Sequence, residues 1–236
     1  MMIFLALTII LLVVVTYLIK KKLYEKTDYY IQTKKSYISV MRDKGHLGEF
    51  YTYKNLKKLK GHKRFLFNLY LPKENGETTE LDVVLLHESG VYVFESKNYS
   101  GWIFGTESQQ YWTQTLANGK GKSQKSRFFN PIIQNKVHLK WLQNFLADQT
   151  IPFYSYIVFS ERCTLKDINL TSGNHHVIKR YDLYDAVQSN AAKSGTRLRP
   201  QKINMLYQKL YPLTQIDEAK KVVHVETIRR KQHIYH

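Results

Sequence analysis

Residues Thr79 to Gly101 read TELDVVLLHESGVYVFESKNYSG, two apolar runs separated by a short polar break. The runs Leu81–Leu86 and Val91–Glu95 predict two adjacent strands. The break, His87–Gly90, predicts the turn between them, because its glycine supplies the positive φ that such a turn commonly requires. A β-hairpin therefore lies at the centre of the predicted core.

The strands of this hairpin carry three charges: Asp82 lies in the first strand, and Glu95 and Lys97 close the second. Side chains two positions apart on a strand point to the same face, so Glu95 and Lys97 are predicted to project together. Charges at the rim of an apolar sheet cost free energy unless they pair or hold a metal ion. A structural ion pair is one interpretation. The other is a metal site, in which Asp82 and Glu95 give oxygen ligands to Mg²⁺ and Lys97 polarises a phosphate.

The composition indicates one well-buried domain with extensions, because two full domains would be cramped in 236 residues. Lys and Arg number 36 against 19 Asp and Glu, which gives a formal charge of +17. Such an excess predicts a polyanionic partner, either nucleic acid or an acidic lipid surface. The single cysteine, Cys163, excludes an intrachain disulfide and a zinc site built on several thiolates.

Residues 1–19 contain no charged side chain and predict a transmembrane helix. As a helix they span roughly 28 Å, close to the hydrocarbon thickness of a bilayer. A cleaved signal peptide is the alternative, although the segment lacks a basic leading region and a small-residue cleavage pattern. Because Lys20–Lys22 follow at once, the positive-inside rule predicts a single-pass protein of the cell membrane with its domain on the cytoplasmic side.

Residues 20–44 form a predicted basic juxtamembrane segment, a spacer that mixes tyrosines and lysines without a clear period. Near anionic lipid each basic charge contributes around 1 kcal/mol, so this segment is suited to lie along the membrane surface. A nucleic-acid backbone would suit it equally, and the sequence leaves both partners open.

Residues 45–160 supply the rest of the predicted core. A helical pattern follows Gly45 and ends at Gly61, with Glu49 in its first turn, where a carboxylate complements the helix dipole. That structural role is one interpretation of Glu49. Further strands are predicted at Phe65–Leu71, Gly101–Gly105, Tyr111–Gln114 and Phe153–Phe159.

The segment Asn118–Arg127 is predicted as a mobile loop that contacts phosphates. It carries four basic residues and no acidic one: Lys120, Lys122, Lys125 and Arg127. An exposed loop that merely happens to carry lysines is the alternative interpretation.

Asn130–Pro131 predicts the start of a helix, with asparagine as N-cap and proline at the first helical position. The helix is expected to run to about Leu146, and Gln134 and His138 share one of its faces. Residues 161–236 form a C-terminal extension. Its predicted elements are an edge strand at His176–Ile178, short helices at Asp182–Gln188 and Gln201–Leu210, and a basic tail at Lys220–His236.

The chain resembles the nuclease-related domain (NERD) family, which is placed in the PD-(D/E)XK nuclease superfamily. The resemblance covers roughly Gly45 to Phe159. The residues that carry it are Gly45-x-x-Gly48-Glu49, Leu81-Asp82, Gly90-Val91-Tyr92-Val93-Phe94-Glu95-Ser96-Lys97-Asn98, Gly101-Trp102-Ile103-Phe104-Gly105, Trp112 and Asn130-Pro131-x-x-Gln134-x-x-x-His138.

The resemblance implies an α/β fold of the restriction-endonuclease type, a mixed central sheet flanked by helices. It also implies that Asp82 and Glu95 are ligands of Mg²⁺ or Mn²⁺ and that Lys97 is the catalytic lysine. Glu49 and Gln134 would be auxiliary site residues.

Two functions follow as hypotheses. The first is a membrane-anchored nuclease that hydrolyses phosphodiester bonds in DNA or RNA with the help of Mg²⁺. The alternative is a catalytically silent module at the membrane that binds nucleic acid or acts as a scaffold, for which the positive charge alone is sufficient. A third use of that charge is binding to anionic lipid.

Overall fold

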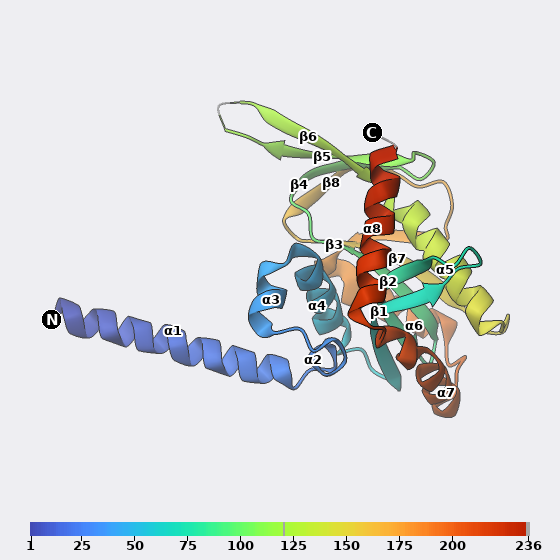
Figure 1. The fold of residues 1–236 in the computed structure, drawn as a ribbon, viewed down its shortest axis with the longest axis horizontal. Coiled ribbons are helices and arrows are strands. Elements are labelled where there is room, and N and C mark those ends of the chain that lie inside the picture. The colour runs from blue at the N-terminus through green and yellow to red at the C-terminus, as the bar shows by residue number, and fades with distance from the viewer. Residues whose placement is uncertain (120, 235–236) are drawn as a thin grey trace.

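The computed structural model describes residues 1–119 and 121–234, and this part of the chain forms two mixed β-sheets flanked by helices (Figure 1). The helices are α1 (Met2–Glu25), α2 (Asp28–Thr33), α3 (Tyr37–Arg42), α4 (Lys44–Leu56), α5 (Pro131–Leu146), α6 (Leu183–Ser194), α7 (Pro200–Leu210) and α8 (Glu218–Ile234). The strands are β1 (Lys63–Pro72), β2 (Thr78–His87), β3 (Gly90–Lys97), β4 (Gly101–Thr106), β5 (Tyr111–Ala117), β6 (Ser123–Phe129), β7 (Phe153–Phe159), β8 (Cys163–Asn169) and β9 (His175–Lys179). The predicted mixed α/β class is confirmed.

The larger sheet has the strand order β1-β2-β3-β7-β9. The first three strands form antiparallel pairs, whereas β7 pairs parallel with β3 and β9 pairs parallel with β7. The predicted hairpin is β2 and β3, with Gly90 at a φ of +143° in the turn. The edge strand predicted at His176–Ile178 is β9.

A second sheet, of order β6-β5-β4-β8, joins the predicted central sheet. Strands β4, β5 and β6 pair antiparallel, and β8, from the C-terminal extension, adds a parallel strand beside β4. Trp112, Phe159 and Cys163 are buried together and connect the two sheets through a shared apolar cluster.

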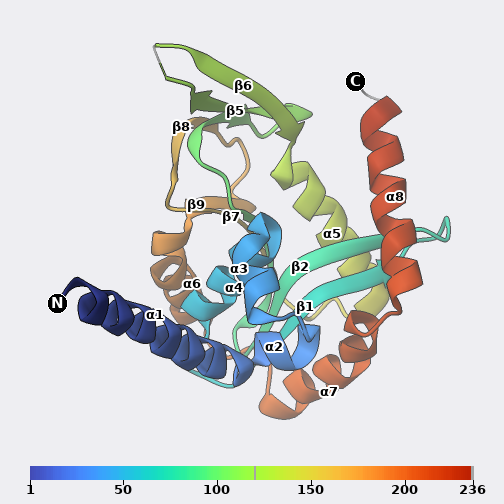
Figure 2. The same cartoon turned by 60° about the vertical axis from the view of Figure 1, so that its left-hand side comes forward.

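Helices cover both faces of the larger sheet (Figure 2). On one face, α2, α4 and α6 pack against alternate strand residues such as Phe67, Val83 and Phe94. On the other face, α5 and α7 pack against residues of opposite parity such as Val91 and Val93. This alternation is the period of two that a strand buried on both faces must have.

The juxtamembrane segment is folded and is not a free spacer. Tyr24, Tyr29 and Val40 are buried in the core against the α4 face of the sheet. The ring of Tyr29 meets that of Phe67 edge-on at 4.9 Å between centroids. This segment contains the end of α1 followed by α2 and α3, which have six residues each. Helices of that length are too short to show a repeat in the sequence.

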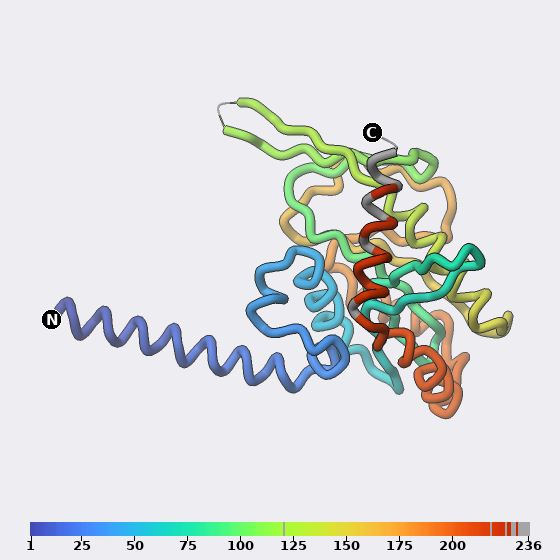
Figure 3. The backbone as a smooth tube through the Cα atoms, viewed as in Figure 1, coloured from blue at the N-terminus to red at the C-terminus, as the bar shows by residue number. Residues whose placement is uncertain are grey.

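Helix α1 extends away from the body of the fold (Figure 3). The 18-residue stretch of α1 that is most apolar has a mean hydropathy of 3.0 and no buried residue. The length and composition of α1 therefore suit a membrane span. A signal sequence has the same properties at this position.

Two details of the prediction are wrong. Helix α4 ends at Leu56, and Gly61, with a φ of +91°, lies in the connection to β1. Most of the predicted loop Asn118–Arg127 belongs to the β5–β6 hairpin, because Ser123 and its successors pair with β5. The basic tail, for which no secondary structure is predicted, is helical as α8 through Ile234, and residues 235–236 lie outside the described part of the chain.

Candidate active site

Strands β2 and β3 separate at the point where the two predicted metal ligands lie. Their ladder ends at the pair Val83–Phe94, so Asp82 and Glu95 occupy the next positions outward. From there β3 continues along β7 while β2 continues along β1. Asp82 bridges the opening, since its Oδ2 accepts a hydrogen bond from the backbone N–H of Ser96 at 2.9 Å.

Glu95 and Lys97 project to the same face, as their spacing predicts. The Nζ of Lys97 lies 2.7 Å from Oε1 of Glu95 and donates to Oε1 of Gln134 at 3.2 Å. Burial alone would lower the pKa of Lys97, but Glu95 outweighs it and raises that pKa above its ordinary value. Burial alone would raise the pKa of Glu95, but Lys97 and then His138 hold it below its ordinary value.

His138 joins this group from the same face of α5 as Gln134. Its Nδ1 lies 2.7 Å from Oγ1 of Thr79, and its Nε2 lies 3.2 Å from Oε2 of Glu95. The second approach is not aligned as a hydrogen bond, and within the described residues neither atom has another hydrogen-bond partner. Glu95, only 1% exposed, therefore has Oε1 in contact with Lys97 and Oε2 close to His138 without an aligned hydrogen bond.

Glu49 reaches the same region from α4. We call Glu49, Asp82 and Glu95 the carboxylate centre. Burial is the main reason that the pKa of Asp82 lies well above its ordinary value, and Glu95 and Glu49 raise it further. Burial also raises the pKa of Glu49, against the lowering effect of Lys35. Burial and mutual repulsion therefore oppose the simultaneous ionisation of all three carboxyl groups.

No sequence pattern predicts a role for the residues that hold Glu49. Its Oε2 accepts hydrogen bonds from the hydroxyl of Tyr29 at 2.8 Å and from Nδ2 of Asn68 at 3.1 Å. Lys35 in turn donates from Nζ to Oδ1 of Asn68 at 2.7 Å. Because an ammonium group can only donate, Lys35 fixes the amide orientation in which Asn68 donates to Glu49. An asparagine within the apolar run Phe65–Leu71 was the available signal.

Asn68 also marks an irregularity in β1. The register passes from Phe67–Val83 to Leu69–Leu81, which leaves Asn68 opposite Asp82. Asn68 has a φ of +49°, a left-handed conformation that asparagine tolerates better than most residues. On either side of it the strands present their apolar side chains to different faces of the sheet. This local reversal places Asp82 at the opening between β2 and β3.

The predicted phosphate-contacting residues lie elsewhere. Lys122, Lys125 and Arg127 are exposed on the β5–β6 hairpin, which projects from the body in Figures 1 and 2. The guanidinium of Arg127 lies over the ring of Tyr111 at 5.6 Å. Among the described residues no hydrogen bond or ion pair links these three side chains to the carboxylate centre, and Lys120 lies outside the description.

Comparison with known proteins agrees with this geometry. Residues 44–160 match the family described as nuclease-related domain. Over 189 residues the chain is 32% identical to an uncharacterized protein of Bacillus anthracis, and the match covers 80% of this chain and 85% of that protein. The chain belongs to the nuclease-related domain family. No solved structure matches it.

The NERD match contains the whole carboxylate centre together with Lys97, Gln134 and His138. Tyr29 and Lys35 precede it, although both belong to the network around Glu49. The folded unit that carries the carboxylate centre therefore begins before the family match does.

The residues present fit a hard divalent cation. Within the described part of the chain, no group of three or more His, Cys, Asp or Glu side chains is arranged as a ready metal cluster. Mg²⁺ does not need one, because it commonly keeps several waters and takes one or two protein carboxylates. Asp82 and Glu95 are two such carboxylates, and among the described residues Oε2 of Glu95 lies 3.2 Å from Nε2 of His138 but has no aligned hydrogen-bond donor.

Proposed function

We propose that this NERD protein is a metal-dependent nuclease that hydrolyses phosphodiester bonds in DNA or RNA. The observation that carries the proposal is the contact of Lys97 with Glu95, at 2.7 Å, beside Asp82 where β2 and β3 separate. Carboxylates for a cation and a positively charged donor beside them are the groups that phosphoryl chemistry requires.

In this proposal Asp82 and Glu95 hold Mg²⁺ or Mn²⁺. A bound cation would supply charge neutralisation at the phosphate and a lowered pKa of an attacking water. The raised pKa of Lys97 keeps its ammonium charged at neutral pH, so it donates to phosphate oxygens and does not act as a general base. Gln134 orients that ammonium group, and Glu49 adds a third carboxylate at the edge of the site.

A cleavage assay tests the proposal. Full-length protein in detergent is incubated with labelled single- and double-stranded DNA and RNA, with Mg²⁺ or Mn²⁺ and with a chelator. We expect metal-dependent cleavage by wild type and by Lys58→Ala, a surface control, and none by the double variant Glu95→Ala/Lys97→Ala. Cleavage that survives in the double variant would show that the activity belongs to a contaminant.

A catalytically silent binding module is the second candidate, and one observation favours it. The ammonium of Lys97 already neutralises Glu95 at 2.7 Å, as a structural ion pair would. In that case nucleic-acid binding weakens steeply with salt and does not respond to Mg²⁺ or to Asp82→Ala. If the protein binds nucleic acid in this way and does not cleave it, the binding function is correct and the nuclease function is not.

We also propose that α1 anchors the protein in the cell membrane with the NERD domain in the cytoplasm. The support is the uncharged apolar helix followed directly by Lys20, Lys21 and Lys22. The lysines of residues 20–44 are then positioned near the membrane surface, where anionic lipid would attract them. Nucleic acid and Mg²⁺ are both available on that side.

A further inference from the structure

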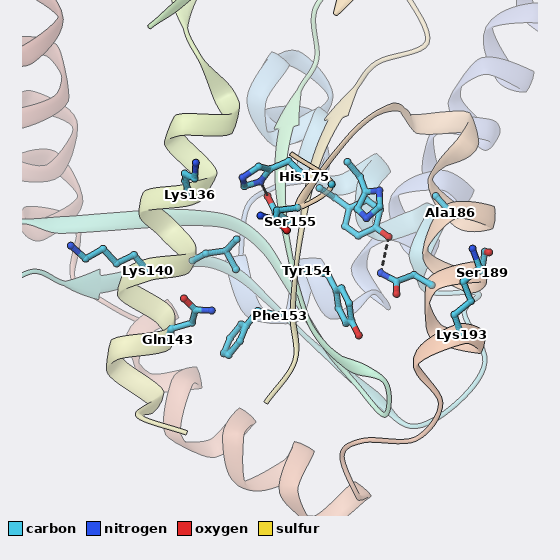
Figure 4. Close-up of a pocket in the computed structure, with 16 residues that line it drawn as sticks. Lys136, Lys140, Gln143, Phe153, Tyr154, Ser155, His175, Ala186, Ser189 and Lys193 are labelled. Atoms are coloured by element: carbon cyan, nitrogen blue, oxygen red, sulfur yellow. Dashed lines mark hydrogen bonds between the residues drawn. The ribbon is translucent and has the colours of Figure 1, made fainter. Parts of the chain in front are cut away.

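A pocket of about 800 Å³ lies on the opposite side of α5 from the carboxylate centre. It opens between α5 and α6 beside the edge of β7, as Figure 4 shows. The opening exists because β9 begins only at His175, opposite Ser155, and leaves Phe153 and Tyr154 without a partner strand on that side.

The pocket is distinct from the carboxylate centre, because the two lie on opposite faces of α5. Gln134 and His138 face the carboxylates, whereas Lys136 and Lys140 line the pocket. Residues two positions apart on an α-helix point roughly 200° away from each other, so these two pairs lie on opposite faces of α5. A ligand in the pocket is therefore not the reacting group.

The charge of the pocket lining selects anions. Three lysines line it, Lys136 and Lys140 from α5 and Lys193 from α6, and its lining includes no aspartate or glutamate. The other polar groups of the lining are amides, hydroxyls and imidazoles. Flexible surface lysines alone would not define a site, because they attract any anion weakly.

A buried imidazole provides the second, independent observation. His175 is 6% exposed and lines the pocket, and its Nε2, which neighbouring atoms enclose in this structure, has no hydrogen-bond partner among the described residues. A buried polar nitrogen without a partner costs free energy. A ligand atom that reached it and accepted a hydrogen bond would remove this cost, which would favour binding.

The hydrogen bonds behind His175 decide which proton it carries. The backbone carbonyl of Val93 can only accept, so it fixes Asn135 with its Nδ2 group as donor, at 3.2 Å. The same Nδ2 donates to Oγ of Ser155 at 2.8 Å. The hydroxyl proton of Ser155 is then free to be donated to Nδ1 of His175, 2.9 Å away.

This series of hydrogen bonds makes Nδ1 of the neutral ring an acceptor. Its proton is therefore on Nε2, which is a donor without an acceptor. The opposite tautomer would leave the hydroxyl proton of Ser155 without a partner, which is the less satisfied arrangement. Burial, assisted by Lys136, lowers the pKa of His175 and favours this neutral ring.

We propose that this pocket binds the phosphate group of a nucleotide, with His175 Nε2–H donating to a phosphate oxygen and Lys136 compensating its charge. Phe153 and Tyr154 supply flat apolar surface beside it, which suits the base and sugar. The phosphate can come from a free nucleotide or from the end of a strand. The proposal is independent of cleavage at Glu95.

The test follows the imidazole nitrogens of His175 by NMR, together with calorimetry, on the full-length protein in detergent at low salt. The probes are adenosine monophosphate, a 5′-phosphorylated oligonucleotide and adenosine without phosphate. We expect the phosphorylated probes to shift the Nε2 resonance and adenosine to leave it unchanged. If the oligonucleotide alone shifts it, the phosphate comes from a strand, and if the monophosphate does so too, free nucleotides suffice.

Variants separate the site from general charge. Lys136→Glu should weaken binding roughly tenfold or more, whereas Lys58→Glu, an equal charge change on a distant surface, should not. His175→Phe removes the ring donor and should also weaken binding, and Lys136→Glu tests the proposal if the His175→Phe protein fails to fold. Glu95→Ala should bind the phosphorylated probes as tightly as wild type does, which distinguishes the pocket from the carboxylate centre. Absence of binding to both phosphorylated probes, or equal loss in Lys58→Glu, would overturn the proposal.

Discussion

The ammonium of Lys35 donates to Oδ1 of Asn68 at 2.7 Å, across 33 residues of sequence. Through Asn68 this contact reaches Glu49 and so connects the segment after the apolar helix with the carboxylate centre. Because Lys35 lies outside the NERD match, its contribution comes from the segment that precedes the matched domain.

Replacing Lys35 by methionine should lower kcat about tenfold and leave KM unchanged. The amide of Asn68 would be free to rotate, and Glu49 would lose a fixed donor worth roughly 1.5 kcal/mol. Lys35→Arg keeps a donor and should restore part of the rate, and Lys58→Met serves as the control. Steady-state cleavage kinetics measure this. A raised KM at unchanged kcat would instead identify Lys35 as a direct phosphate contact.

Glu49→Gln should stabilise the protein by about 1 to 2 kcal/mol at neutral pH while reducing activity. The pKa of Glu49 is raised in the fold, mainly by burial, so the folded state holds this proton to higher pH than the unfolded chain. The free energy of unfolding therefore falls as pH rises from the ordinary glutamate pKa to the raised one. Glutamine can still accept from Tyr29 and Asn68 but carries no charge.

Urea denaturation between pH 4 and 8, in chelator, measures this effect. The difference in stability between variant and wild type should grow with pH through that window and then level off. A difference that is the same at every pH would mean that Glu49 does not titrate as described.

Periodicity was sufficient to predict which of these side chains share a face. Glu95 and Lys97 do so because they lie two apart on β3, and Gln134 and His138 do so because they lie one turn apart on α5. The helix start at Asn130 was likewise readable, since the side chain of Asn130 caps the backbone N–H of Ile132 at 2.8 Å.

Contacts between distant segments were not predictable in this way. The fourth strand of the second sheet is β8, which pairs with the distant β4, and the network around Glu49 depends on Tyr29 and Lys35, which local patterns do not pair with anything. The face reversal at Asn68 breaks the period of two on which strand prediction relies. These features are set by tertiary packing and not by local propensity.

The β5–β6 hairpin should contribute to affinity for nucleic acid and not to the chemical step. Replacing Lys122, Lys125 and Arg127 by alanine should weaken binding and make it less dependent on salt, by about 0.9 in the logarithmic slope for each lost phosphate contact. The value of kcat at saturating substrate should not change. Binding titrations over a range of salt concentrations measure the slope.

A triple alanine variant at Lys57, Lys58 and Lys60, exposed residues beyond α4, removes the same charge and is the matched control. Equal changes in slope for both variants would show that only net charge matters and that the hairpin is no specific contact.

The orientation in the membrane is testable with a single reporter. Cys163 is 1% exposed and donates its S–H to the backbone oxygen of Ser160, so it should resist labelling in the folded protein. We expect Lys58→Cys, in a Cys163→Ala background, to react with a membrane-impermeant maleimide only after the cells are opened. Labelling of intact cells would place the NERD domain outside and contradict the cytoplasmic assignment.

Binding of Mn²⁺ is the most direct test of the proposed centre, because Asp82 and Glu95 are proposed to hold the catalytic cation. Electron paramagnetic resonance can count bound Mn²⁺ on wild type, Asp82→Asn, Glu95→Gln and the surface control Glu74→Gln. We predict one site on wild type and on the control, an affinity lower by about 100-fold in the other two variants, and cleavage that saturates together with Mn²⁺ occupancy. Unchanged Mn²⁺ affinity in Glu95→Gln, or cleavage without bound metal, would contradict a metal-dependent nuclease at this centre.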